Sequence, residues 1–266
     1  MGNHENLKQK RKPLLKEFQK KSELKKLDGI TLFPSAMQVF HEPSLEWCFK
    51  PLLSTKKHVL GKEYNIHLLS TDGIYLEKDF LNSESYFFGF KYLEGKYSFL
   101  GNLKAFGNSN FSELYQVLKK DFALKKDEYL EKKICSKEYY EINKEIIKNT
   151  ARFTKAQDPQ YFAEAFYCYE FTKYYFEKTG KFCHINEVTE NYGHDENDIL
   201  LGKDEIKDYV DEFFINLEDY FKNNYNLNEN MAVCGTEGFR FTCYGGMSIA
   251  FIDTEQDIIY ILEYHS

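Results

Sequence analysis

The sequence predicts an α+β fold, in which a strand-rich N-terminal section and a C-terminal antiparallel meander surround a helical middle. Two observations predict it. Residues 63–100 and 238–264 contain short, β-rich apolar runs separated by turn sequences, whereas residues 110–178 carry apolar side chains at helical spacing. The order of strands, then helices, then strands lacks the strand–helix alternation of a doubly wound parallel sheet, which leaves the α+β class.

The N-terminal elements are a basic arm, an irregular segment and a set of strands. Residues 1–28 are predicted to form a loosely docked basic helical arm, because nine lysine and arginine residues lie within residues 1–26 against three acids. Residues 30–60 contain three prolines and are predicted to be irregular. The sequence Leu93-Glu94-Gly95 is predicted to be the turn of a hairpin. The predicted strands of this section are 63–69, 73–76, 85–92 and 96–100.

The helical middle is predicted from caps and periodicity. Asn110 with Glu113 has the pattern of a capping box, and Asp158 followed by a proline is a strong helix start. Gly180 is a suitable end for the helix that starts there, and that helix is apolar nearly all round, which places it at the centre of the core. The predicted helices are 110–133, 138–151 and 158–178.

The C-terminal section is predicted to be a three-stranded meander with glycine-rich and polar turns. Its strands are expected at 238–244, 247–253 and 257–264. The chain from residue 29 to residue 266 is predicted to be a single α+β domain, with a sub-boundary near 105–135 as the alternative division. Whether the two strand-rich sections share one sheet is left open by the sequence.

The most biased surface that the sequence predicts is an acidic helix over residues 203–223. Residues 185–222 hold twelve carboxylates against three lysines. Apolar side chains form one stripe of the helix and carboxylates the opposite face. Ordinary helix faces mix signs, because i,i+4 pairs of Glu and Lys are stabilising. This face largely lacks such pairs, which indicates a cationic counterpart, with plain solvation or a contact to the chain's own basic arm as alternatives. The outward carboxylates are Glu205, Asp208, Asp211, Glu212 and Asp219.

Composition argues against several functions. The formal net charge is −7 and the chain has three arginines, whereas nucleic-acid readers depend on arginine for bidentate contacts. No run approaches 18 apolar residues and the N-terminus is charged, so neither a membrane span nor a secretory signal is expected. We therefore predict a cytoplasmic protein with six reduced cysteines. The excess of Phe and Tyr fits the codon bias of an AT-rich genome and is not taken as a binding signal.

No motif with a specific chemical mechanism is present. The sequences Ser54-Thr55-Lys56-Lys57 and Lys178-Thr179-Gly180 resemble the S-x-x-K and K-T-G motifs of serine β-lactamases, but the second ends a helix, so both are interpreted as chance matches. Cys183 beside His184 would need a lowered thiol pKa to act as a nucleophile. The acidic loop at 194–198 lacks the periodicity of a calcium loop. We expect no catalytic residue, no metal and no cofactor.

These observations favour a non-catalytic intracellular protein-binding module that engages a basic protein partner through the acidic helix face. The natural biological form of this hypothesis is a bacterial immunity or antitoxin-like protein, in which complementary charge speeds the encounter with a toxin. The alternative is an enzyme of unrecognised family, a hydrolase above all, with its pocket between the helical middle and the meander. A structural scaffold would instead show a large exposed apolar patch.

Overall fold

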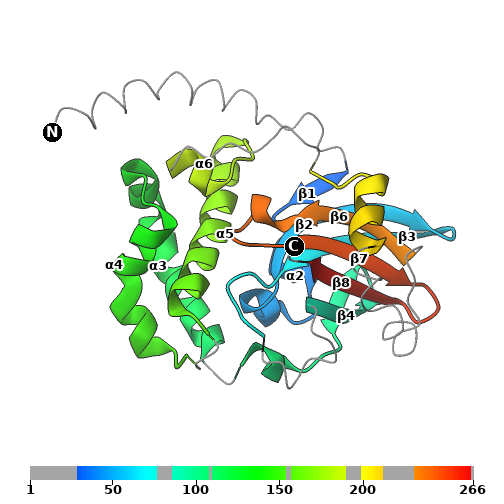
Figure 1. Ribbon diagram of the computed structural model, residues 1–266, viewed down its shortest axis with the longest axis horizontal. Helices are drawn as coiled ribbons and strands as arrows, with labels where there is room; N and C mark the ends of the chain where they lie inside the picture. The colour runs from blue at the N-terminus through cyan, green and yellow to red at the C-terminus, as the bar shows by residue number, and fades with distance from the viewer. Residues whose placement is uncertain are drawn as a thin grey trace.

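The computed structural model describes residues 29–76, 86–107, 110–153, 157–189, 199–211 and 231–264. The predicted basic arm of residues 1–28 lies outside the described residues. The described chain forms two antiparallel sheets beside a group of helices, and the α+β prediction is confirmed (Figure 1).

The two sheets have three and five strands. The first sheet has the order β1-β2-β3, and its strands are β1 (Ile30–Leu32), β2 (Lys50–Val59) and β3 (Lys62–Ser70). The second sheet has the order β5-β4-β8-β7-β6, with strands β4 (Tyr86–Leu93), β5 (Lys96–Phe99), β6 (Ala232–Glu237), β7 (Met247–Asp253) and β8 (Ile258–Tyr264). Because β4 pairs with β8, the N-terminal hairpin and the C-terminal meander share one sheet.

The helices form the other half of the molecule, and α5 lies between the α3–α4 pair and the sheets (Figure 1). The main helices are α3 (Phe111–Lys132), α4 (Ser136–Thr150) and α5 (Pro159–Thr179), followed by the short α6 (Ile185–Thr189). The remaining short elements are α2 (Ala36–Val39), η1 (Pro43–Trp47), η3 (Leu103–Phe106) and η5 (Gly238–Arg240).

Helix α5 lies at the centre of the core, where its capped ends and its many buried side chains place it. The Asp158 side chain accepts a hydrogen bond from the Gln160 amide at 2.8 Å, and Gly180 ends the helix with a φ of 69°. Twelve of its side chains are buried, and Tyr167 stacks on Tyr139 of α4 with ring centroids 4.4 Å apart. The predicted start, end and central position of this helix are confirmed.

Three local predictions are wrong. Residues 50–59 form β2 rather than an irregular segment, since Pro51 lies at a register shift near the start of the strand, where a missing amide is tolerated. Residues 73–76 form no strand. The first strand of the meander is β6, six residues earlier than predicted, because Gly238 turns the chain and donates its amide to the Gly246 carbonyl at 2.9 Å.

Candidate functional site

The described part of the acidic helix, residues 203–211, is helical and covers the outer face of the five-stranded sheet. Ile206 and Val210 are buried against that sheet, whereas Glu205 and Asp208 are exposed. Glu212 and Asp219, the other predicted contact residues besides Asp211, lie outside the described residues. The amphipathic arrangement predicted for this helix is therefore present over its first nine residues.

The carboxylates of this helix have local partners that the sequence analysis did not foresee. Lys207 forms an i,i+4 ion pair with Asp211, so the predicted lack of such pairs is wrong at this position. Glu205 accepts a hydrogen bond from the Gly202 amide at 2.6 Å and thereby caps the helix. Of the predicted contact residues that are described, Glu205 and Asp208 remain most accessible.

A cleft of about 390 Å³ lies where the first turns of α5 meet two loops. One loop is the turn at residues 72–76 after β3, and the other is the segment 242–246 that leads into β7. The cleft is lined by three tyrosines, two carboxylates and one amide, namely Tyr75, Tyr161, Tyr244, Asp158, Glu164 and Gln160. Among the described lining residues there is no lysine or arginine.

The three tyrosines form a row along the cleft. The ring of Tyr161 lies between the other two, with centroids 4.9 Å from Tyr75 and 5.4 Å from Tyr244. Tyr75 is 45% and Tyr244 53% exposed, and no other Phe, Tyr or Trp side chain of the described residues is exposed to that degree. Nearly all the described Phe and Tyr side chains thus enter the core, whereas the exposed ones gather at this cleft.

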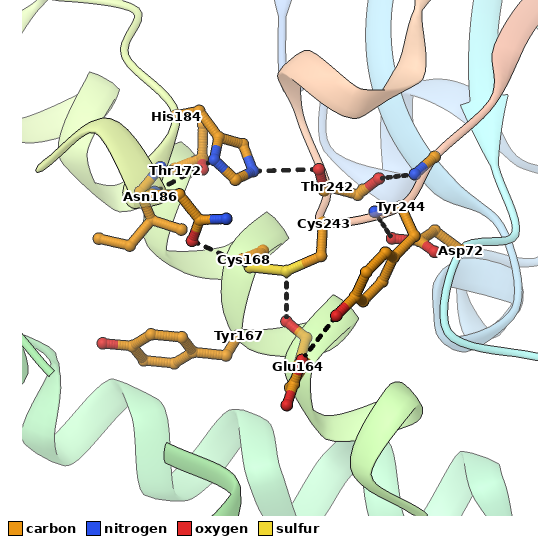
Figure 2. Close-up of a disulfide and its surroundings, with 12 residues drawn as sticks. Asp72, Glu164, Tyr167, Cys168, Thr172, His184, Asn186, Thr242, Cys243 and Tyr244 are labelled. Atoms are coloured by element: carbon orange, nitrogen blue, oxygen red, sulfur yellow. Dashed lines mark hydrogen bonds between the residues drawn. A yellow bond between two sulfur atoms is a disulfide. The ribbon is translucent and has the colours of Figure 1, made fainter. Parts of the chain in front are cut away.

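Glu164 is the buried carboxylate of the cleft. It is 2% exposed and accepts a hydrogen bond from the Gln160 amide group at 2.7 Å. It also accepts one from the Tyr244 hydroxyl at 3.0 Å (Figure 2). Both donors are neutral. Glu170, two turns further along α5, is also buried, but Lys173 and Lys119 lie close enough to lower its pKa against the larger, opposite effect of burial. Among the described residues, Glu164 has no such cation.

Asp72 joins the three segments that form the cleft. Its two carboxylate oxygens accept hydrogen bonds from the Tyr161 hydroxyl at 2.7 Å and from the Tyr244 amide at 3.1 Å. Burial and the Asp72 charge raise the pKa of Tyr161, so its phenol stays neutral and keeps donating. Beneath the turn, the buried Lys50 donates to the Asp72 carbonyl. Burial lowers the pKa of Lys50, while the negative charges of Asp72 and Glu263 oppose that effect.

The turn at residues 72–76 needs glycine at one position to reach α5. Gly73 has a φ of +94°, and a Cβ placed on it would lie 2.7 Å from the Cβ of Ala165. A side chain there would be strained by the backbone conformation and would also push the turn away from the helix. Gly73 therefore fixes the distance between Tyr75 and the rest of the tyrosine row.

A disulfide between Cys168 and Cys243 fastens α5 to the loop that carries Tyr244, with Cα atoms 5.8 Å apart (Figure 2). The Cys243 sulfur lies 3.4 Å from the Glu164 carbonyl oxygen, directly behind the cleft. The prediction that all six cysteines are reduced is wrong for this pair, because the fold brings together two residues 75 positions apart. Disulfides are uncommon in cytosolic proteins, so this bond does not support the predicted cytoplasmic location.

The same loop is also held by a histidine. His184 donates through Nε2 to the Thr242 carbonyl at 3.0 Å and accepts through Nδ1 from the Asn186 amide at 3.1 Å (Figure 2). Because the disulfide cysteine Cys243 directly follows Thr242, the disulfide and this contact together fix residues 242–244 to the helical half of the molecule.

The nucleophile candidates have the wrong environments for catalysis. Burial and the nearby Glu187 raise the pKa of the Cys183 thiol, whereas a nucleophilic thiol needs a lowered one. The Ser54 hydroxyl lies 2.6 Å from Nδ1 of His67, but both residues are buried, and they are directly paired across strands β2 and β3. Burial lowers the pKa of His67 to about 4, which makes it a weak base. We interpret this pair as a structural hydrogen bond.

Comparisons with known proteins give no family. No protein-family model, no curated protein and no solved structure matches the chain. Within the described ranges no three acidic, histidine or cysteine side chains are grouped so as to hold a metal ion. The helices in those ranges include none with the length and apolar character needed to cross a membrane. The candidate site therefore depends on its own geometry.

Proposed function

We propose that the protein is a non-catalytic binding module that engages a basic protein partner, and that the cleft holds a cationic group of that partner. The observation that carries the proposal is Glu164, a buried carboxylate in the cleft whose described partners are neutral donors. Buried carboxylates in proteins are normally paired with a cation. A group from the partner would supply the missing charge.

The acidic helix at 203–211 supports the same function in a second way. Its exposed carboxylates, Glu205 and Asp208, would attract a basic partner over a distance and orient it before contact. Glu212 and Asp219, which lie outside the described residues, remain part of the sequence-based prediction. The most specific biological form of the proposal remains an immunity or antitoxin-like protein that covers a cationic site on a toxin.

The proposal is tested by capture followed by measurement. The immobilised protein, with its disulfide intact, is exposed at low salt to a lysate of its source organism, and the retained protein is identified, purified and titrated. We expect a basic protein whose affinity falls about tenfold or more in a variant carrying Glu164→Gln and Tyr75→Ala, mainly through faster dissociation.

The matched control carries Glu131→Gln and Leu124→Ala, which make the same kinds of change at exposed positions of α3. Equal affinities of the cleft variant and the control variant for the captured protein would contradict the proposal. Retention of no basic protein at all would contradict it as well.

One observation favours the alternative, a hydrolase. The cleft lies between the helical middle and the meander, where an enzyme was expected to have its pocket, and Glu164 and Asp158 both line it. Paired carboxylates can act as general acid and base. Turnover in a screen of ester, glycoside and peptide substrates that is lost in Glu164→Gln would support this second function.

A further inference from the structure

The cleft also has the features of a selective site for one kind of cation. This inference rests on the proposed function and names the chemical group that enters the cleft. We infer that the cleft binds a primary alkylammonium group, as in a lysine side chain, with the tyrosine row against its alkyl chain and Glu164 accepting its N–H.

The tyrosines supply the first half of the argument. Cations, including the ammonium group of lysine, are attracted to the faces of aromatic rings within about 6 Å of the ring centroid. Tyr75 and Tyr244 are the exposed members among the described Phe, Tyr and Trp side chains, and both lie next to Tyr161 in the cleft. The cleft volume of about 390 Å³ is near the lower end of the usual range for ligand sites, which suits a single side chain.

The carboxylate supplies the second half. Each oxygen of Glu164 already accepts one hydrogen bond, one from Gln160 and one from Tyr244. With one hydrogen bond on each oxygen and only 2% of the residue exposed, little of the carboxylate edge remains open to the two parallel N–H···O bonds of a guanidinium, so arginine would lose its bidentate geometry here. An ammonium group is a compact charge that needs one remaining lone pair. A quaternary ammonium has no N–H to donate to Glu164.

These properties predict an order of affinities for four small probes that differ in one group. The probes are Nα-acetyl-lysine methylamide and its arginine, Nε-trimethyl-lysine and Nε-acetyl-lysine counterparts. Ligand-observed NMR titration detects binding in the millimolar range. We expect the lysine probe to bind, the arginine and trimethyl-lysine probes to bind about tenfold more weakly, and the neutral acetyl-lysine probe not to bind.

Variants assign that binding to the cleft. Glu164→Gln keeps the size and one acceptor of the side chain but removes its charge, and should weaken the lysine probe about tenfold. Tyr75→Ala changes an exposed side chain and should weaken it about threefold or more. The control Glu131→Gln should leave the lysine affinity unchanged. Thermal unfolding of each variant shows that the fold is kept.

The source of the ammonium group is distinguished with n-butylamine. Affinity equal to that of the lysine probe points to a free amine, and weaker affinity points to a side chain on a protein; either result supports the inference. Equal binding of the lysine and acetyl-lysine probes would overturn it, and so would a lysine affinity unchanged in Glu164→Gln. If all four probes fail while a captured basic protein still depends on the cleft, this inference is wrong and the proposed function stands.

Discussion

The cleft and the acidic helix are both acidic, but their carboxylates lie in different environments. Glu164 is enclosed and has neutral donors, whereas Glu205 and Asp208 face solvent and Asp211 is paired with Lys207. A charge pair interacts more strongly away from water, while exposed charges are weakened by salt. The exposed carboxylates of the acidic helix are therefore suited to attracting a partner, and the enclosed Glu164 is suited to holding it.

The two regions also differ in how they are held. The segments that form the cleft are connected by the disulfide, by Asp72 and by the contact between His184 and Thr242. Each of these contacts joins distant parts of the chain. The helix at 203–211 is attached to the sheet through apolar side chains such as Ile206 and Val210. Changes that loosen the cleft should therefore leave the helix in place.

The largest expected effect comes from the disulfide. Replacing Cys168 and Cys243 with alanine should lower the free energy of unfolding by about 4 kcal/mol, since the bond closes a loop of 75 residues. Affinity for the lysine probe should fall as well, because Tyr244 follows Cys243 directly. Denaturant unfolding with and without a dithiol reductant measures the first effect. Cys135→Ser, at a cysteine outside the disulfide, is the control, and equal stability of the two variants would contradict the role of the bond.

His67 makes the free energy of unfolding depend on pH. The fold favours its neutral form, with a pKa of about 4 against 6.5 when unfolded, so the unfolded chain binds the extra proton first as pH falls. This contribution to stability is complete above pH 6.5 and is lost as pH falls towards 4, about 3 kcal/mol in all. Unfolding across this range should be less pH-dependent in His67→Gln; an unchanged pH profile would contradict the assignment.

Gly73→Ala should affect the cleft but not the acidic helix at 203–211. The substitution strains a positive φ and brings a Cβ against Ala165, so we expect a loss of about 2 kcal/mol and weaker binding of the lysine probe. Gly95 has a similar φ of +80° with open space around it. Gly95→Ala therefore carries the backbone strain alone, and an equal cost for both variants would show that the contact with α5 does not matter.

The smallest effect concerns the helix. Reversing Glu205 and Asp208 to lysine should slow association with the captured partner about tenfold at low salt, with little change in dissociation. High salt should remove the difference. The control reverses Glu131 and Glu145, which makes the same change in net charge on α3 and α4. Equal slowing in both variants would mean that net charge, rather than this face, attracts the partner.

Local patterns were enough to predict much of the fold. The three long helices follow from apolar periodicity and from caps such as Asp158 and Gly180. The hairpin turn at Glu94-Gly95 has positive φ at both residues, which glycine favours at the second position. The capping box expected at Asn110 is absent although its helix is present, which shows that packing rather than the cap fixes that start. The strand predicted at 238–244 does not form, because the hydrogen bond from the Gly238 amide to the Gly246 carbonyl turns the chain there.

The cleft could not be predicted in the same way. Its tyrosines come from three segments at positions 75, 161 and 244, and the disulfide joins residues 75 positions apart. Nothing near any one of them in the sequence distinguishes it from the many tyrosines of the core. The available signal was the expected pocket between the helical middle and the meander, which gave the place but not the residues.

The most direct test of the central claim is an NMR titration of the protein with labelled tyrosine rings. Nα-acetyl-lysine methylamide is added to the disulfide-bonded protein, with the acetyl-lysine probe in parallel. We predict shifts at Tyr75, Tyr161 and Tyr244 with the charged probe and none with the neutral one. Shifts of equal size with both probes, or no shift at these three rings, would contradict a cation-binding cleft.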